Sequence, residues 1–242
     1  MEVPIQLSEI YTQKILDEIK HGVFANSSRL PPESEIAKQF GISRTLIRDC
    51  LAILEREGFI SRKHGIGTLV NQHVLGVKTR IDLEQEFLEM FSSVGMKPEI
   101  SFTHNYHTKA DVLLAENLKI EEGEDLLCSE RLILADGIPA IYCMDYVPIR
   151  NICTKDYDEK ILEKPIFEFL KLYCNTTVDM DLSEIMAIVA DETLAELFRI
   201  EKGSPILYMN EVGYSFNGKP VLFSKEYYRQ GILKQTILRK KI

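Results

Sequence analysis

One sequence pattern occurs twice in this 242-residue chain and restricts the fold of its second half more than any other feature. Residues 110–123 and 190–203 share Ala-Asp-x-x-Leu-Ala-Glu, followed by Ile-Glu-x-Gly, at an offset of 80 residues. Each copy is predicted to form a short helix followed by a turn. A repeat of this length predicts two similar structural units within one domain.

Each copy is followed by two apolar segments that are predicted strands. The first copy precedes residues 126–134 and 140–146, and the second precedes 206–214 and 221–227. Asp136-Gly137 and Asn217-Gly218 separate the strands, and such dipeptides are strong hairpin signals. We therefore expect an antiparallel sheet with pseudo-twofold character and helices on one face, with a further helix (165–173) and strand (178–186) between the copies.

The first part of the chain has a different pattern, in which short helices are separated by tight turns. Helices are predicted over residues 8–22, 33–41 and 43–58 from apolar spacing, prolines at the second start and glycines at the ends. Only Gly41 and Ile42 separate the second helix from Ser43, a good N-cap for the third. Two short helices joined this closely are a helix-turn-helix arrangement.

The outward face of the third helix carries the residues that such a helix places in a major groove. Ser43, Arg44, Thr45 and Arg48 lie in its first turn and a half, where contacts to bases and phosphates are made. Two predicted strands follow, joined by a glycine-rich turn over residues 63–67 that contains His64 and Gly65. A glycine there allows close approach to DNA.

Charge and composition exclude several classes of protein. Residues 1–76 are neutral, with 9 basic and 9 acidic side chains, so residues 77–242 carry the whole net charge of −8. No apolar run approaches the ~18 residues of a membrane span, and the N-terminus does not resemble a secretory signal. The five scattered cysteines contain no CxxC pair and predict a cytoplasmic location. No motif predicts a metal or a cofactor.

Three blocks in register resemble the winged-helix domain of GntR-type bacterial transcription regulators. They are residues 30–37, 42–48 and 57–70. The resemblance implies that Arg44, Thr45, Arg48, His64 and Gly65 lie at the operator. At the position in the second helix where the family can carry a DNA-contacting Arg, this chain has Ser34. The remainder resembles the UTRA effector domain of the HutC-like subfamily, whose fold is similar to that of chorismate lyase.

Four charged residues are predicted to share one face of the second-domain sheet with apolar side chains. The repeat places Asp145 and Glu226 at equivalent positions, while Glu184 and Arg131 lie on the same face of their own strands. Charged groups on such a face must pair with each other or meet a ligand. Internal pairing of Arg131 with a carboxylate remains the alternative to a ligand site.

The resemblance adds two residues to this site and indicates what it binds. It implies that Glu86 and Tyr228 contact the effector. UTRA members that bind sugar phosphates carry a second Arg two residues after the first, where this chain has Ile133. A phosphate would face several carboxylates with only Arg131 to balance it, so we expect an effector without phosphate.

Together these features predict a two-domain α/β protein. Residues 1–72 form a winged helix-turn-helix domain, 73–80 a linker, and 81–242 an α+β effector-binding and dimerisation domain with an antiparallel, chorismate-lyase-like sheet. The predicted function is a homodimeric repressor that a small-molecule effector releases from a palindromic double-stranded DNA operator. The alternative is a small-molecule enzyme of chorismate-lyase-like fold, but such an enzyme has no use for a winged helix.

Overall fold

The structure is a computed structural model that describes residues 7–83, 85–154 and 156–240. The described chain separates into two compact units. Residues 83–234 form the second unit, and residues 7–82 form the first together with residues 235–240. The expected boundaries did not include this return of the chain end to the first unit.

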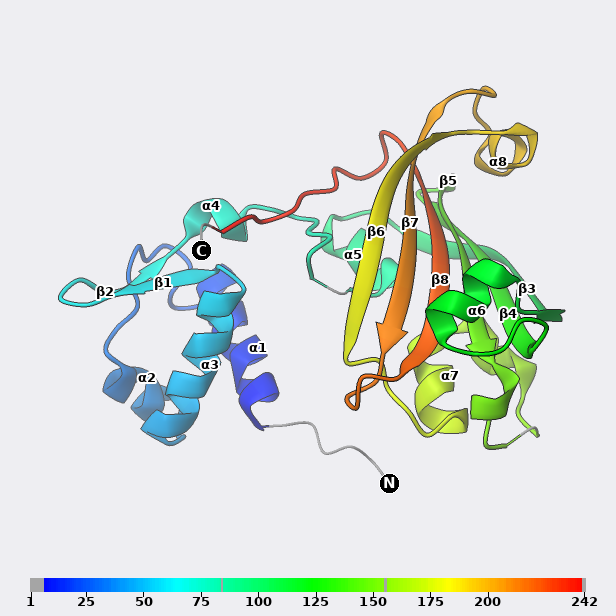
Figure 1. The fold of residues 1–242 in the computed structure, drawn as a ribbon. Helices are drawn as coiled ribbons and strands as arrows, with labels where there is room; N and C mark the ends of the chain where they lie inside the picture. The colour runs from blue at the N-terminus through cyan, green and yellow to red at the C-terminus, as the bar shows by residue number, and fades with distance from the viewer. Residues whose placement is uncertain (1–6, 84, 155, 241–242) are drawn as a thin grey trace. The chain divides into compact units, whose positions relative to one another are not determined.

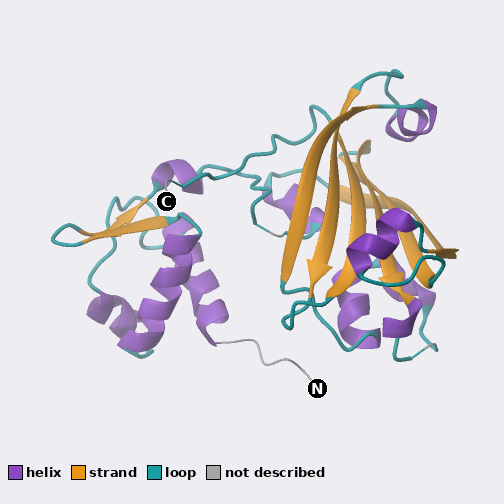
Figure 2. Ribbon diagram, viewed as in Figure 1, coloured by secondary structure: helices purple, strands orange, loops and turns teal. Residues whose placement is uncertain are grey.

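The first unit has the predicted three helices and hairpin (Figures 1 and 2). Its elements are α1 (Leu7–Lys20), α2 (Glu33–Phe40), α3 (Arg44–Arg56), β1 (Ile60–Lys63), β2 (Gly67–Val70) and α4 (Gln72–Leu75). Fully buried Ile15, Ile36, Ile47 and Leu51 form part of its core. The sequence did not predict α4, which occupies the start of the expected linker. The rest of that linker, through Arg80, also groups with the first unit.

Residues 235–240, here called the C-terminal strap, lie against the winged-helix elements. The Ile81 amide donates to the Thr236 carbonyl at 2.9 Å, and Lys240 Nζ donates to the Glu55 carbonyl at 2.7 Å. The Leu238 side chain lies so close to Gly58 that a Cβ there would approach it to 2.4 Å. Gly58 also has φ +84°, so a side chain would be unfavourable for two separate reasons.

The second unit is built on one antiparallel six-stranded sheet in the order β3-β4-β5-β8-β7-β6 (Figure 1). Its elements are α5 (Phe87–Ser93), β3 (Pro98–Lys109), α6 (Val112–Leu118), β4 (Asp125–Ala135), β5 (Ile138–Pro148), η1 (Ile149–Asn151), η2 (Glu159–Glu163), α7 (Ile166–Tyr173), β6 (Met180–Val189), α8 (Glu192–Phe198), β7 (Pro205–Tyr214) and β8 (Pro220–Arg229). The predicted fold class is confirmed.

The repeat extends one strand further than the sequence pattern indicates. Each half is a strand, a helix and a hairpin: β3-α6-β4-β5 and β6-α8-β7-β8. Asp111 and Asp191 cap the two helices identically, each accepting a 2.8 Å hydrogen bond from the amide three residues later. The halves meet where β5 pairs with β8, which places the pseudo-twofold relation at the centre of the sheet.

Helices cover both faces of the sheet, whereas the sequence predicted only one covered face. The repeat helices α6 and α8 pack on one face, each against strands from both halves. Helices α5 and α7 pack on the other face, where Phe91 and Phe169 are fully buried. The expectation of helices on one face is therefore wrong, because it considered only the helices inside the repeat.

We predict that Phe223→Ala strongly destabilises the second unit. Phe223 is fully buried on β8 beneath α6, and truncating a buried Phe costs about 3–5 kcal/mol. Phe216→Ala is the matched control, because Phe216 is 89% exposed and its loss is expected to cost less than about 0.5 kcal/mol. Urea denaturation followed by circular dichroism measures both, and equal losses would contradict this account of the core.

Candidate functional site

The N-terminal turn of α3 presents the predicted DNA-contacting side chains to solvent. Ser43 caps the helix by accepting a hydrogen bond from the Leu46 amide at 3.1 Å. Arg44, Thr45 and Arg48 are exposed, while Ile47 between them is fully buried. The buried residue fixes the rotation of the helix, so the two arginines and Thr45 point away from the core.

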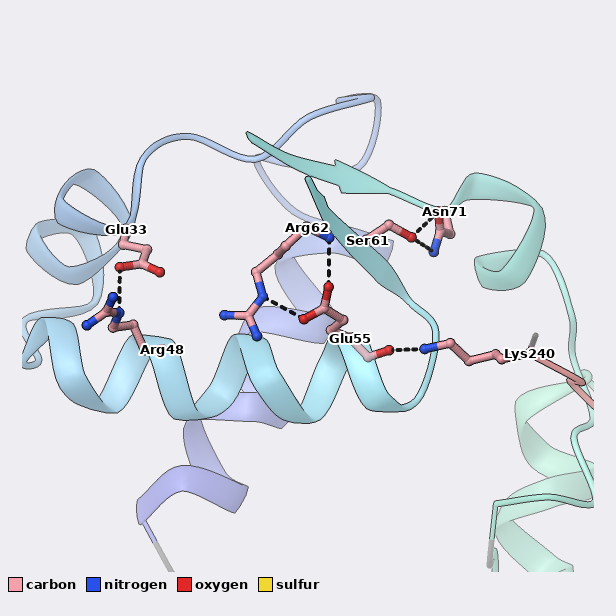
Figure 3. A network of polar contacts seen from close by, with 7 residues as sticks. All are labelled: Glu33, Arg48, Glu55, Ser61, Arg62, Asn71 and Lys240. Carbon is pink, nitrogen blue, oxygen red and sulfur yellow. Dashed lines mark hydrogen bonds and ion pairs between the residues drawn. The ribbon is translucent and has the colours of Figure 1, made fainter. Parts of the chain in front are cut away.

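Two arginines of the first unit differ in how firmly they are held (Figure 3). Arg48 makes a 3.3 Å ion pair with Glu33, but its side chain remains 69% exposed. Arg62 on β1 donates to Glu55 through both its backbone amide, at 2.8 Å, and its side chain, at 2.7 Å. Exposed ion pairs contribute little, so Arg48 can exchange Glu33 for another acceptor, while Arg62 fixes the hairpin to α3.

The hairpin tip has the open geometry that the sequence predicts. Gly65 adopts φ +76°, with no neighbouring atom within 4 Å of the position a Cβ would take. His64 beside it is exposed. At the base of the hairpin, Asn71 donates to Ser61 at 3.0 Å (Figure 3). It also donates to the Gly58 carbonyl at 2.7 Å. The wing is thus anchored at its base and unobstructed at its tip.

A second candidate site is a narrow recess on the face of the sheet covered by α5 and α7. Strands β4 to β8 form its floor, and the segment that leads into α5 contributes Gln85, Glu86 and Phe87. Its charged lining residues are Glu86, Arg131, Asp145, Asp181, Glu211 and Glu226. The recess therefore contains four of the six residues predicted to bind the effector.

Two rows of facing residues cross the sheet at this recess. One row joins Asn105, Ser129, Asp145, Ser224, Glu211 and Ser183, each opposite the next on the neighbouring strand. The other joins Thr103, Arg131, Cys143, Glu226, Met209 and Ile185 in the same way. The pseudo-twofold relation exchanges the rows, so Arg131 corresponds to Glu211 and Asp145 to Glu226.

Arg131 and Asp145 form a buried ion pair. Arg131 donates to Asp145 at 2.5 Å and to the Lys164 carbonyl at 3.1 Å, and both charged side chains are less than 10% exposed. The second oxygen of Asp145 accepts from the Ser224 hydroxyl at 2.6 Å. Internal pairing, which the sequence left open, is present, and it lies in the wall of the recess.

Glu226 and Glu211 form a carboxyl pair at the centre of the second half of the sheet. Burial raises the pKa of both, and the charge of Glu211 raises the pKa of Glu226 further. Tyr228 donates to the other side of Glu226, and Ser183 donates to Glu211 at 2.5 Å. Both shifts favour a protonated carboxyl in this pair. Tyr228 supports Glu226 and does not itself line the recess.

Glu86 lies at the N-terminal end of α5, on the opposite side of the recess from the sheet. Burial raises the pKa of Glu86 to about 7, and the positive charge of Arg131 only partly offsets this effect. The Glu86 carboxyl therefore gains or loses a proton near neutral pH. It can donate a hydrogen bond when protonated and is an anion when it has lost the proton.

The placement of Glu184 was wrong, and Glu211 was missed. Glu184 is exposed on β6 and lies opposite Asn210, whereas Ser183 and Asp181 face the recess. Strand β6 lies at the sheet edge and is exposed on both faces, so alternation of apolar residues does not show which face is covered. The repeat itself could have identified Glu211, because adding the offset of 80 to Arg131 gives this position.

Comparisons with known proteins identify the family to which both units belong. Residues 7–70 match the family of bacterial regulatory proteins called gntR, and residues 93–231, more than half of the chain, match the UTRA domain. The chain is a GntR-type transcription regulator of the HutC-like subfamily. No helix among the described residues is long and apolar enough to span a membrane, and those residues contain no cluster of His, Cys, Asp and Glu suited to a metal.

Relatives of this regulator span nearly its whole length. It is 26% identical over 226 residues to the HTH-type transcriptional repressor NagR of Bacillus subtilis, covering 93% of this chain and 91% of the relative. It is 24% identical over 230 residues to the "Probable fructoselysine utilization operon transcriptional repressor" of Escherichia coli K12, covering 95% and 93%. The first relative is named as a transcriptional repressor and the second as a probable one, in agreement with the family of this chain.

Solved structures show the same fold. The possible transcriptional regulator YydK of Bacillus subtilis superposes with a TM-score of 0.78 at 21% identity, covering 98% of this chain and 100% of that one. PhnF of Mycobacterium smegmatis gives a TM-score of 0.56 at 19% identity, covering 97% and 99%.

We predict that Glu86→Gln raises the melting temperature at pH 8. The folded pKa of about 7 exceeds the ordinary value of 4.5, so folding favours the protonated form and stability falls as pH rises between those values. Because Glu86 is only half-buried, we expect a gain of about 1 kcal/mol, or about 2–4 °C. The gain should vanish near pH 4.5, and exposed Glu184→Gln should show none; a gain independent of pH would contradict the assignment.

Proposed function

We propose that this regulator is a cytoplasmic homodimeric repressor that binds a pseudo-palindromic operator and is released by a small effector without phosphate. The main support is the exposed N-terminal turn of α3 beside an open wing, within a unit that matches the gntR family over residues 7–70. The recess in the UTRA domain supports the effector part of the proposal.

In this proposal, α3 enters the major groove and the wing contacts the flanking backbone. Arg44 and Arg48 contact guanine edges or phosphates, and Ser43 and Thr45 donate to phosphate near the helix N-terminus. His64 and Gly65 approach the backbone at the wing tip, where no side chain obstructs them. Arg48 would exchange its exposed ion pair with Glu33 for a contact to DNA.

We predict that Arg44→Ala and Arg48→Ala each weaken operator binding. Loss of a guanine contact should cost about 1–3 kcal/mol at one base pair, whereas loss of a phosphate contact should weaken all sequences and lower the salt slope by about 1. Arg56→Ala is the control, because Arg56 is also exposed but lies at the other end of α3. Fluorescence anisotropy at several salt concentrations measures these effects, and equal behaviour of all three variants would reject this orientation of α3.

Dimerisation through the second unit is supported by the edge strand β6. Met180 and Leu182 on this strand are 60% and 65% exposed, and Ile185 is 47% exposed. An edge strand with exposed apolar side chains is ready to pair with another strand, and a second copy satisfies the symmetry of a palindromic site. One winged helix reads only a few base pairs, so two are needed for specific recognition.

We predict that Leu182→Glu yields monomers and lowers operator affinity by at least tenfold. A charge at this edge opposes strand pairing, because it must lose its hydration when another chain covers it. Leu172→Glu is the matched control, since Leu172 is 61% exposed on α7 and is not part of the edge strand. Sedimentation velocity gives the oligomeric state, and a Leu182→Glu variant that remains dimeric would exclude this edge as the interface.

The absence of phosphate in the proposed effector follows from the charges around the recess. Arg131 is already paired with Asp145, and the position that would supply a second Arg is Ile133, which packs in the core. Glu86, Glu211 and Glu226 face the same space, so a phosphate would meet several acidic groups. A tenfold effect on operator affinity needs only about 1.4 kcal/mol of coupling between effector and DNA.

The proposed working parts follow the predicted division of the chain, except that the C-terminal strap packs on the DNA-binding unit. Residues 1–72 bind DNA, residues 73–80 link the two functions, and residues 81–242 bind effector and dimerise. Glu86 stands four residues after Asp82, the last residue of the first unit before the chain enters the second. An effector that contacts Glu86 therefore acts close to the point where the chain passes between the units.

A further inference from the structure

The recess has an excess of acidic side chains, because its cation, Arg131, is already neutralised by Asp145. Its lining contains the carboxyl groups of Glu86, Asp181, Glu211 and Glu226 in addition to that pair, and no second cationic side chain among the described residues. The two halves of the sheet differ at equivalent positions, because Glu211 in the second half occupies the position of Arg131 in the first. One half of the site therefore holds a neutral ion pair, and the other half is acidic.

The Glu211–Glu226 pair has the geometry of a receptor for a cation. The two side chains come from neighbouring strands and lie diagonally, since Glu226 faces Met209 and Glu211 faces Ser224. Ser183 and Tyr228 each bind one carboxyl from outside the pair, which fixes both carboxyl groups in place. The proton on this pair is the group that a bound cation would replace.

The Arg131 side of the recess offers a complementary donor. Arg131 is 6% exposed and lines the recess, yet its Nε has no hydrogen-bond partner among the described residues. Its two terminal nitrogens are used by Asp145 and by the Lys164 carbonyl. A ligand oxygen that reaches this buried Nε would satisfy it, while the carboxyl pair lies on the other half of the sheet.

We propose that the effector is a protonated primary amine that also carries a hydroxyl or carbonyl oxygen. Its ammonium group binds Glu211 and Glu226 in place of the proton on this pair, which passes to solvent, and its oxygen accepts a hydrogen bond from Arg131. The inference rests on the proposed function, because it identifies the chemical class of that effector.

Other ligand classes fit these groups less well. A phosphate or carboxylate would lie beside at least one ionised carboxyl and would leave the proton of the acid pair in place. A neutral polyol could bind but would leave the acidic half of the recess without a compensating charge. An ammonium group supplies both the positive charge and three donors, which the carboxyl oxygens can accept.

The first test compares amines with their own N-acetyl derivatives. The full chain is melted at pH 7.5 with galactosamine, tyramine, ethanolamine and 4-aminobutanol, each beside its N-acetyl form, and with galactose 6-phosphate. We expect stabilisation by at least one amine and by none of the other compounds. A panel in which no amine stabilises the chain, or in which an acetylated or phosphorylated compound does, overturns the inference.

The second test measures the proton that the amine displaces. Calorimetry of the stabilising amine in two buffers of different ionisation enthalpy should show release of about one proton for each amine bound. Glu226→Gln and Glu211→Gln should each weaken binding at least tenfold and reduce this release, whereas exposed Glu184→Gln should change neither. Binding without proton release, or undiminished in both pocket variants, contradicts the exchange of proton for ammonium.

Operator binding separates this inference from the proposed function. If a compound without an amine releases the chain from its operator, the inference fails and the proposed function stands. If the chain binds no operator under any condition, the proposed function fails, while calorimetry still decides whether the recess binds amines.

Discussion

The pairing of β5 with β8 is the constraint on which the rest of the second unit depends. These strands belong to different copies of the repeat, and their hydrogen bonds join two three-stranded halves into one sheet. The same register sets Asp145 opposite Ser224 and Cys143 opposite Glu226. Residues about 80 positions apart in the chain thereby share one recess. A slip of one residue would turn every one of these side chains to the other face.

Much of this architecture follows from local sequence signals, and what was missed has identifiable physical causes. The repeat predicts both hairpins and the pseudo-symmetry, and the Gly41-Ile42-Ser43 turn predicts how α2 meets α3. The face occupied by Glu184 could not be read from alternation, because β6 is exposed on both sides. Helices α5 and α7 lie outside the repeat, so its pattern carries no information about the face they cover. The strap returns across more than 150 residues to Asp82, beyond the range of any local signal.

The recess concentrates the features that weaken a fold. A buried ion pair and a buried acid pair are both less favourable than apolar side chains of similar volume. Around them, apolar clusters beneath α5, α6, α7 and α8 cover the sheet. Buried charged groups inside an otherwise apolar core are typical of a binding site. A ligand can supply the hydrogen bonds and the opposite charge that the protein alone does not.

The strap also has a consequence for the order in which the protein is assembled during synthesis. The ribosome makes residues 7–82 first, but their contacts with Thr236, Leu238 and Lys240 form only after the whole second unit has been translated. The winged helix thus receives these hydrogen bonds only after the second unit has been translated. A nascent or prematurely terminated chain lacks these contacts. The DNA-binding unit can therefore be completed only in a chain that already contains the second unit.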